Sequence, residues 1–259
     1  MSQIPVFFGV LRYEFWMQFR RRALWITIIC FILFISWRGF GGIFRELIGN
    51  PFHFQLLPFI ADWTSSINAI FLIAIGVLLA DRLPRDRRTK VDELFTTMPG
   101  KLSTRLVGKY LGSTLATLIP VFAIYSIGIG CILYQNHDLS IIPMALATFA
   151  VIALPGILFV GAFSIACPSL LWVPLYQFLF VGYWFWGNLL SPRVGIPTLS
   201  KTILTPIGGY MATGFFGNPY GQPGATPLQG VESIILLLGI TVLVMVTLWG
   251  LMKWQQARQ

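Results

Sequence analysis

The chain has 259 residues, of which 56% are hydrophobic and 10% are charged, and its net charge is +9. A soluble globular domain carries about 25% charged residues, so this composition excludes an ordinary soluble domain and predicts an integral membrane protein. A positive net charge can indicate nucleic-acid binding. Here, however, the basic residues cluster beside the ends of apolar runs, where anionic lipid headgroups and membrane orientation explain them. We therefore expect the lipid bilayer, and no nucleic acid, as their partner.

The apolar runs are long and continuous rather than short and alternating, which predicts an all-α protein and not a β-barrel. Six runs predict transmembrane helices. They cover residues 23–37, 58–80, 104–134, 141–166, 170–190 and 231–252. The fourth run contains Pro155-Gly156, which predicts a break in that helix.

The distribution of Lys and Arg predicts the orientation of these spans. With the N-terminus inside, 14 basic residues lie on the cytoplasmic side and four on the outer side. The positive-inside rule then favours six spans with both termini in the cytoplasm.

The first 22 residues are rich in aromatic side chains and end in three arginines. We expect a helix over 1–22 that lies at the cytoplasmic interface, with its rings in the headgroup layer. On a helical wheel Glu14 and Gln18 share one side with two of the arginines, which makes the helix moderately amphipathic. The predicted phosphate anchor consists of Arg20, Arg21 and Arg22.

The segment 191–230, before the last span, is long and rich in Gly and Pro. Its central part, 199–216, is apolar but is interrupted by Pro206 and is too short to span a bilayer. It predicts either a pair of short re-entrant helices, tolerated where protein covers the broken backbone, or an ordinary lid over the outer mouth.

The segment 81–103 is a predicted cytoplasmic loop, and the stretch 81–109 holds eight of the 18 Lys and Arg residues. Its middle predicts a short amphipathic helix from Thr89 to Met98. The apolar stripe of this helix has the spacing i, i+3, i+4, i+7, and its members are Val91, Leu94, Phe95 and Met98. The dipeptide Pro99-Gly100 ends the helix. Such a stripe implies a docking surface, whose partner could be lipid headgroups, the protein's own helix ends or a separate soluble protein.

The sequence lacks several motifs that would let the protein bind ATP, hold a metal ion or drive transport by itself. There is no G-x-x-x-x-G-K-[ST] phosphate loop, and the two histidines, His53 and His137, lack metal-ligand spacing. No ionisable residue falls in the middle of a predicted span, where ion-coupled transporters usually place one. These absences argue against a membrane-embedded hydrolase and against a self-powered transporter, although backbone or hydroxyl sites for sodium remain possible. The three cysteines predict no disulfide or metal site.

The arrangement resembles the type 2 ABC exporter permease family. The resemblance rests on the arginine-ended lead, on the long outer segment before the last span, and on the stretch DRRTKVDELFTTMPGKLSTRLVGKYLG. That stretch is similar to the first cytoplasmic loop of the family, in which an acidic residue followed by Leu, then Pro, then Gly-Lys recur at this spacing. The corresponding residues here are Glu93-Leu94, Pro99 and Gly108-Lys109.

The resemblance implies a permease subunit of the bacterial inner membrane that has no enzymatic activity and no cofactor of its own. Two such subunits would pair, and a cytoplasmic ABC ATPase, which carries ATP and Mg²⁺, would bind under each. The helix at 89–98 would be the coupling helix, seated in a groove of the ATPase. The ATPase-coupling residues would be Arg85, Arg88, Val91, Asp92, Glu93, Leu94, Phe95, Met98 and Pro99.

Three other interpretations stay open. The chain could be an ion-coupled carrier or channel without an ATPase, or a membrane scaffold or polytopic enzyme. The amphipathic helix could also lie on its own membrane rather than in a partner. The substrate cannot be inferred from these residues.

Overall fold

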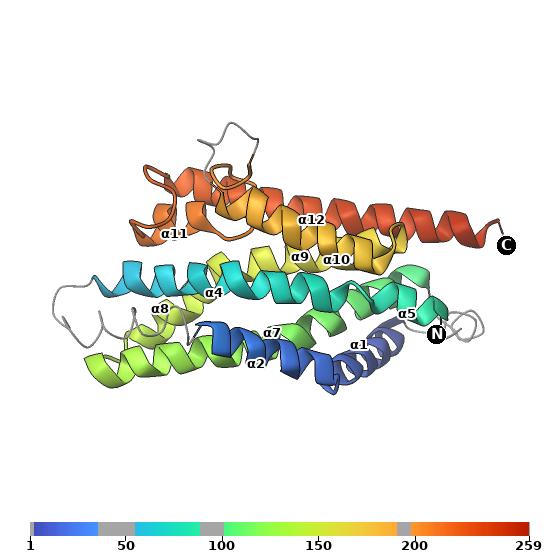
Figure 1. Cartoon of the computed structure of the whole chain (residues 1–259), viewed down its shortest axis with the longest axis horizontal. Helices are drawn as coiled ribbons and strands as arrows, with labels where there is room; N and C mark the ends of the chain where they lie inside the picture. Colours follow the sequence, from blue (N-terminus) through green and yellow to red (C-terminus); the bar gives the residue numbers. More distant parts are fainter. Residues whose placement is uncertain (1–2, 36–54, 89–100, 191–197, 259) are drawn as a thin grey trace.

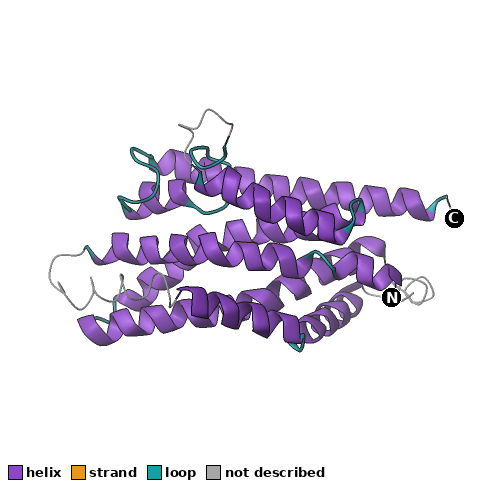
Figure 2. Cartoon of the chain, viewed as in Figure 1, coloured by secondary structure: helices purple, strands orange, loops and turns teal. Residues whose placement is uncertain are grey.

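The computed structural model describes residues 3–35, 55–88, 101–190 and 198–258. Every regular element in these ranges is a helix (Figure 2), which confirms the predicted fold class. In chain order the elements are α1 (Gln3–Phe19), α2 (Arg22–Ile35), α4 (Leu56–Leu79), α5 (Arg82–Arg88), α7 (Leu102–Asn136), α8 (Ile141–Thr148), η2 (Phe149–Ala153), α9 (Leu154–Ala166), η3 (Cys167–Ser169), α10 (Val173–Trp184), η4 (Phe185–Leu189), α11 (Gly209–Phe216) and α12 (Pro227–Gln256).

Within the described ranges, four helical stretches are long and apolar enough to cross a membrane. They are Leu56–Asp86, Leu102–Asn136, Ile141–Ser169 and Pro227–Gln256. These helices indicate a multi-pass membrane protein. The predicted spans 23–37 and 170–190 correspond to α2 and to α10 with η4, which are shorter, and α2 ends where the described residues end. The count of six spans therefore stays a prediction.

The long helices lie side by side along the long axis of the molecule (Figure 1). The start of α1, helix α5, the start of α7 and the end of α12 all lie at one end, on the right in Figure 1. We call this the α5 end. The α7–α8 turn and α11 lie at the opposite end.

Helix α4 is the centre of the bundle, because it contacts α2, α7, α8, α9, α10 and α11. Buried on it are large apolar side chains such as Phe71, Leu72 and Ile75. Two hydrogen bonds fasten α10 to α4, from Trp184 Nε1 to the carbonyl of Ala69 and from Gln177 Nε2 to that of Val77, each 3.0 Å long. In contrast, only 17% of the most apolar part of α12 is buried, whereas 72% of the most apolar part of the helical stretch that contains α4 is buried. Most of α12 therefore faces outward.

The predicted break at Pro155 is wrong, because the chain stays helical from α8 through η2 to α9. Just before the proline the helix widens into a π-turn, in which the Leu154 N–H bonds to the carbonyl of Phe149, five residues back. A proline ring would collide with the carbonyl four residues earlier in a regular α-helix. The wider turn accommodates the ring at this point.

The described part of the outer segment, from residue 198 onward, consists of turns followed by the short helix α11. The turns reach the middle of α4, where Asn68 Nδ2 donates to the carbonyls of Pro206 and Ile207 at 2.9 and 3.0 Å. Irregular backbone inside an apolar bundle needs such donors. These contacts fasten the segment to the core, and its re-entrant position in the outer leaflet stays a prediction.

Helix α1 packs closely along α7. The contact is made possible by Gly108 and Gly112, a G-x-x-x-G pair of the kind that lets two helices approach closely in membranes. A Cβ at Gly112 would lie 2.6 Å from the carbonyl oxygen of Leu11 and 3.0 Å from Glu14 Cβ. The polar side of α1 therefore faces protein. A helix lying at the cytoplasmic interface, as predicted from the sequence, would instead turn its polar side to the cytoplasm.

We predict that Gly112→Ala lowers the thermal unfolding midpoint of the purified protein in detergent. The new methyl group must push back the backbone of α1, which a side-chain rotation cannot relieve. Gly130→Ala in the same helix is the matched control, because nothing lies within 4 Å of its Cβ position. The control should leave the midpoint unchanged or raise it, since alanine is the better helix former. Equal midpoints for the two variants would contradict the close contact.

Candidate functional site

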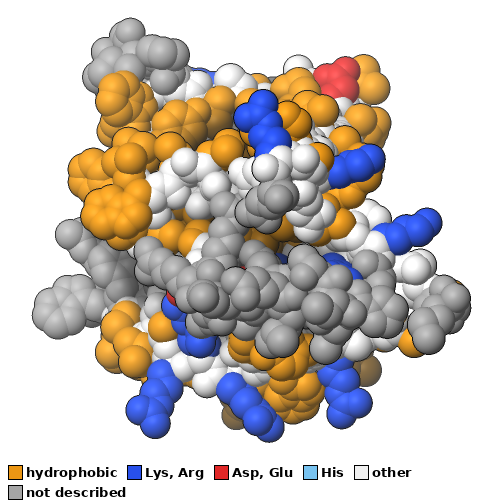
Figure 3. All heavy atoms as spheres, turned by 90° about the vertical axis from the view of Figure 1, so that its right-hand side faces the viewer, with side chains coloured by type: hydrophobic (Ala, Val, Ile, Leu, Met, Phe, Trp, Pro, Cys, Tyr) orange, Lys and Arg blue, Asp and Glu red, His pale blue; other side chains and the backbone are white. Residues whose placement is uncertain are grey.

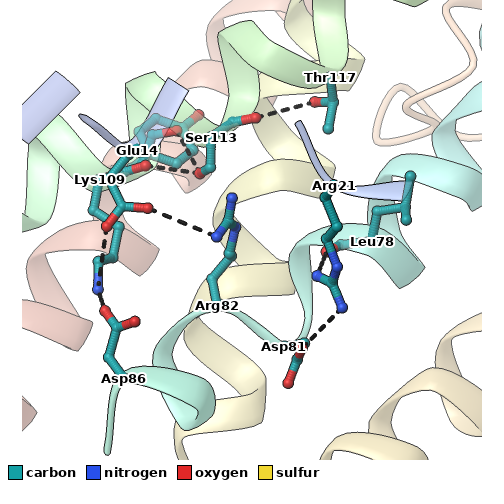
Figure 4. A network of polar contacts seen from close by, with 10 residues as sticks. Glu14, Arg21, Leu78, Asp81, Arg82, Asp86, Lys109, Ser113 and Thr117 are labelled. Carbon is teal, nitrogen blue, oxygen red and sulfur yellow. Dashed lines mark hydrogen bonds and ion pairs between the residues drawn. The ribbon is translucent and has the colours of Figure 1, made fainter. Parts of the chain in front are cut away.

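Four charged side chains are buried together at the α5 end (Figure 4). Glu14 belongs to α1, Arg82 and Asp86 belong to α5, and Lys109 belongs to α7. Their exposed fractions are 1%, 1%, 6% and 7% in that order. We call these four residues the buried charge cluster. It contains two acids and two bases, so its charges balance.

Ion pairs within the cluster cross between three helices. The Nζ atom of Lys109 lies 3.6 Å from Glu14 Oε1 and also pairs with the carboxylate of Asp86. Arg82 Nη1 lies 3.9 Å from Glu14 Oε2. Glu14 is therefore shared by two bases, and Lys109 by two acids.

Local sequence spacing brings these groups together. Arg82 and Asp86 are four residues apart, so they occupy one face of α5. Lys109 follows Gly108 in the first turns of α7, where the G-x-x-x-G pair draws α1 close enough for Glu14 to reach it. Gln18, one turn after Glu14 on α1, is also fully buried.

A second ion pair lies beside the cluster, between Arg21 Nη2 and Asp81 Oδ2 at 2.9 Å. Arg21 also donates to the carbonyl of Leu78 at 3.5 Å. Both side chains of this pair are about a quarter exposed. The pair ties the α1–α2 junction to the two-residue turn, Ala80 and Asp81, that separates α4 from α5.

The three arginines of the predicted anchor therefore lie in different surroundings. Arg21 pairs with Asp81 as described, whereas Arg20 is exposed and its guanidinium lies 5.4 Å from the centre of the Trp16 ring. Arg22 begins α2 and is exposed. Other exposed bases at this end are Arg85, Lys101, Lys253 and Arg258. Figure 3 shows Lys and Arg side chains projecting at the lower and right-hand edges of this face.

The buried charge cluster holds the two helices that precede and follow residues 89–100. Helix α5 ends at Arg88, and α7 begins at Leu102. At the α7 flank, Gln3 Oε1 of α1 accepts hydrogen bonds from the backbone N–H of Lys101 and the hydroxyl of Thr104, at 3.1 and 3.3 Å. Helix α1 is thus attached to α7 along most of its length and to α5 through Glu14.

Most of the predicted coupling residues lie in this span of the chain. Val91, Asp92, Glu93, Leu94, Phe95, Met98 and Pro99 are outside the described residues. Arg85 is exposed on α5, and Arg88 is the last residue of that helix. The structure therefore describes the supports of the predicted coupling helix, and the helix itself stays a prediction.

Burying four charges is costly, because each loses several kcal/mol of hydration and only close pairing offsets the loss. The pairing here is incomplete. Within the described ranges, Arg82 Nε and Nη2 and both amide atoms of Gln18 are buried without a hydrogen-bond partner. Buried ionisable groups in a membrane protein are functional candidates for this reason.

The ion pairs of the cluster hold three helices together. No group of three or more His, Cys, Asp or Glu residues in the described ranges could hold a metal ion.

A second polar group lies deeper in the bundle, between α4, α7 and α8. Tyr125 Oη hydrogen-bonds to the Thr148 hydroxyl at 3.0 Å and donates to the carbonyl of Ala145 at 2.9 Å. Thr64 lies within 3.3 Å of both hydroxyls and donates to the carbonyl of Ile60. These uncharged hydroxyls satisfy one another and hold the three helices together.

In comparisons with known proteins, no protein-family model, no curated protein and no solved structure matches the chain. Any functional assignment therefore depends on its own residues and geometry.

We predict that Glu14→Gln destabilises the protein by about 3–5 kcal/mol, the usual cost of leaving a buried charge without its partner. The variant leaves two buried bases facing the single acid Asp86. Arg21→Gln is the matched control, because its ion pair is partly exposed and such pairs contribute about 1 kcal/mol or less. Chemical or thermal unfolding in detergent measures both. Similar losses of stability in the two variants would contradict the high cost of removing one partner from the buried charge cluster.

Proposed function

We propose that this chain is the membrane-spanning permease subunit of an ATP-driven transporter of the type 2 ABC exporter class. The observation that carries the proposal is that the buried charge cluster joins α1 to both α5 and α7, the helices that precede and follow residues 89–100. A segment that receives force from an outside motor needs a connection to the bundle on each side. The sequence of that segment, with its apolar stripe and its Glu-Leu, Pro and Gly-Lys spacing, supports the same assignment.

In the proposed mechanism, a cytoplasmic ABC ATPase binds the coupling helix at 89–98. Val91, Leu94, Phe95 and Met98 fill a groove on the ATPase, as amphipathic helices do in such grooves, while Arg85, Arg88, Asp92 and Glu93 form the polar rim. ATP and Mg²⁺ bind to the ATPase, and this chain supplies no catalytic group.

Movement then travels through α7, which begins directly after the coupling segment. Its 35 residues correspond to about 50 Å at 1.5 Å per residue, enough to link the α5 end to the opposite end of the molecule. Two permease subunits pair in the bacterial inner membrane, with the α5 end in the cytoplasm, and export an unidentified substrate.

An ion-coupled carrier is the second candidate. The observation in its favour is the presence of hydroxyls and irregular backbone carbonyls inside the bundle, since sodium sites in transporters use such oxygens. Against it, the hydroxyls of Thr64, Tyr125 and Thr148 already bond to one another, and the carbonyls of Pro206 and Ile207 accept from Asn68. Transport by the purified chain in liposomes, driven by an ion gradient without ATP, would establish the carrier instead.

We predict that Leu94→Asp and Phe95→Asp each abolish co-purification of the ATPase subunit, because a carboxylate cannot enter an apolar groove without loss of hydration. Membrane insertion should be unaffected. Leu139→Asp is the matched control, since Leu139 is 73% exposed at the α7–α8 turn, at the opposite end of the molecule. Full recovery of the ATPase with both coupling variants would contradict the proposed contact.

A further inference from the structure

The four groups of the buried charge cluster can be paired in two ways, and both leave every charge balanced. The pairing between helices joins Glu14 to Arg82 and Lys109 to Asp86, as in Figure 4. The alternative joins Glu14 to Lys109, which already lie 3.6 Å apart, and joins Arg82 to Asp86 within α5. The second pairing is open to α5 because residues four apart are neighbours on a helix surface.

Two features of Arg82 make the alternative available. Its pair with Glu14 is long, at 3.9 Å. Its Nε and Nη2 atoms are buried and have no hydrogen-bond partner among the described residues, so two donors are free to receive a carboxylate. Lys109, for its part, already contacts acids on both α1 and α5.

The two pairings differ in what they hold together. In the first, α5 is tied to α1 by one ion pair and to α7 by another. In the second, α1 and α7 stay joined, and α5 has no ion pair to either. The turn formed by Ala80 and Asp81 separates α4 from α5, and the Arg21–Asp81 pair ties this turn to the α1–α2 junction.

We propose that the buried charge cluster is a two-position ion-pair switch, which docks α5 against α1 and α7 in one position and releases it in the other without leaving a buried charge unpaired. Its role in transport rests on the proposed function. There, the ATPase pulls on residues 89–100, and the exchange of partners lets α5 move while α1 and α7 remain a unit. A switch of this kind needs two arrangements of similar free energy.

The first test is the double variant E14K/K109E, which keeps the attraction between α1 and α7 and the net charge. It places a lysine against Arg82 and a glutamate against Asp86, so α5 is repelled from both partners. Spin labels at Tyr13→Cys on α1 and Arg85→Cys on α5, both exposed positions, report the separation of these helices by double electron–electron resonance. Cys30, Cys131 and Cys167 are replaced by Ser in every sample.

We expect E14K/K109E to shift the distance distribution to longer values in the isolated permease. Adding R82E and D86R reverses the charges of α5 and should restore the original distribution. The wild-type distribution in E14K/K109E would overturn the proposal, as would failure of the quadruple variant to restore it.

A second variant, R82Q/D86N, covers the case in which charge reversal prevents folding. It leaves Glu14 and Lys109 paired and removes both charges from α5, so the same shift to longer distances is expected. An unchanged distribution contradicts the switch. Failure of both variants to give monodisperse protein would also contradict it, because the cluster would then have a single obligatory arrangement.

The transport role is tested separately with the ATPase bound. ATP and Mg²⁺ should shift the wild-type distribution toward that of R82Q/D86N, while R82Q/D86N should retain the ATPase and show no further shift. Absence of ATPase binding by the unlabelled wild type, which keeps Arg85, would refute the proposed function and leave the distances in the isolated permease as the test of the switch. Retained binding with no nucleotide-dependent shift would refute the coupling role alone.

Discussion

The arrangement of the α5 end depends on one constraint, that charges removed from water must stay paired. Glu14 is the acid that α1 contributes, and its two bases, Arg82 and Lys109, come from different helices. The cluster therefore links α1, α5 and α7, in addition to the direct packing of α1 along α7. Apolar packing of α4 in the core acts in addition to this constraint, and the same core includes Leu83 of α5 and Tyr110 of α7, which follow Arg82 and Lys109 in the sequence.

The same constraint explains the orientation of α1. A helix at a membrane surface usually turns its polar side to water, but α1 buries Glu14 and Gln18, and Glu14 pairs with bases of α5 and α7. Its outward side carries Phe8 and Trp16, which are 60% and 46% exposed. Aromatic rings of this kind suit the headgroup layer. The helix is therefore held by polar contacts with protein and presents its apolar side to the surroundings.

The two ends of the bundle differ in the kind of contact that holds them. At the α5 end the contacts include the ion pairs of the buried charge cluster and the hydrogen bonds of Gln3. Toward the opposite end they are fixed hydrogen bonds among hydroxyls, carbonyls and Asn68. Helix α7 belongs to both regions, through Lys109 near its start and Tyr125 further along.

Composition and hydropathy by themselves determined that the described part of the chain is all-helical, and they located its long apolar helices to within a few residues, because a bilayer leaves backbone polar groups no other partner. The basic stretch 81–109 also includes three of the four residues of the buried charge cluster. The sequence could not reveal the cluster, since Glu14 and Lys109 are 95 residues apart and each reads alone as an ordinary surface charge. The G-x-x-x-G spacing at Gly108 and Gly112 was the signal that could have suggested a close neighbour for α7. Only the tertiary structure decided that α1 is this neighbour and that its polar side is buried, because the pairing of charges from distant helices depends on how those helices pack.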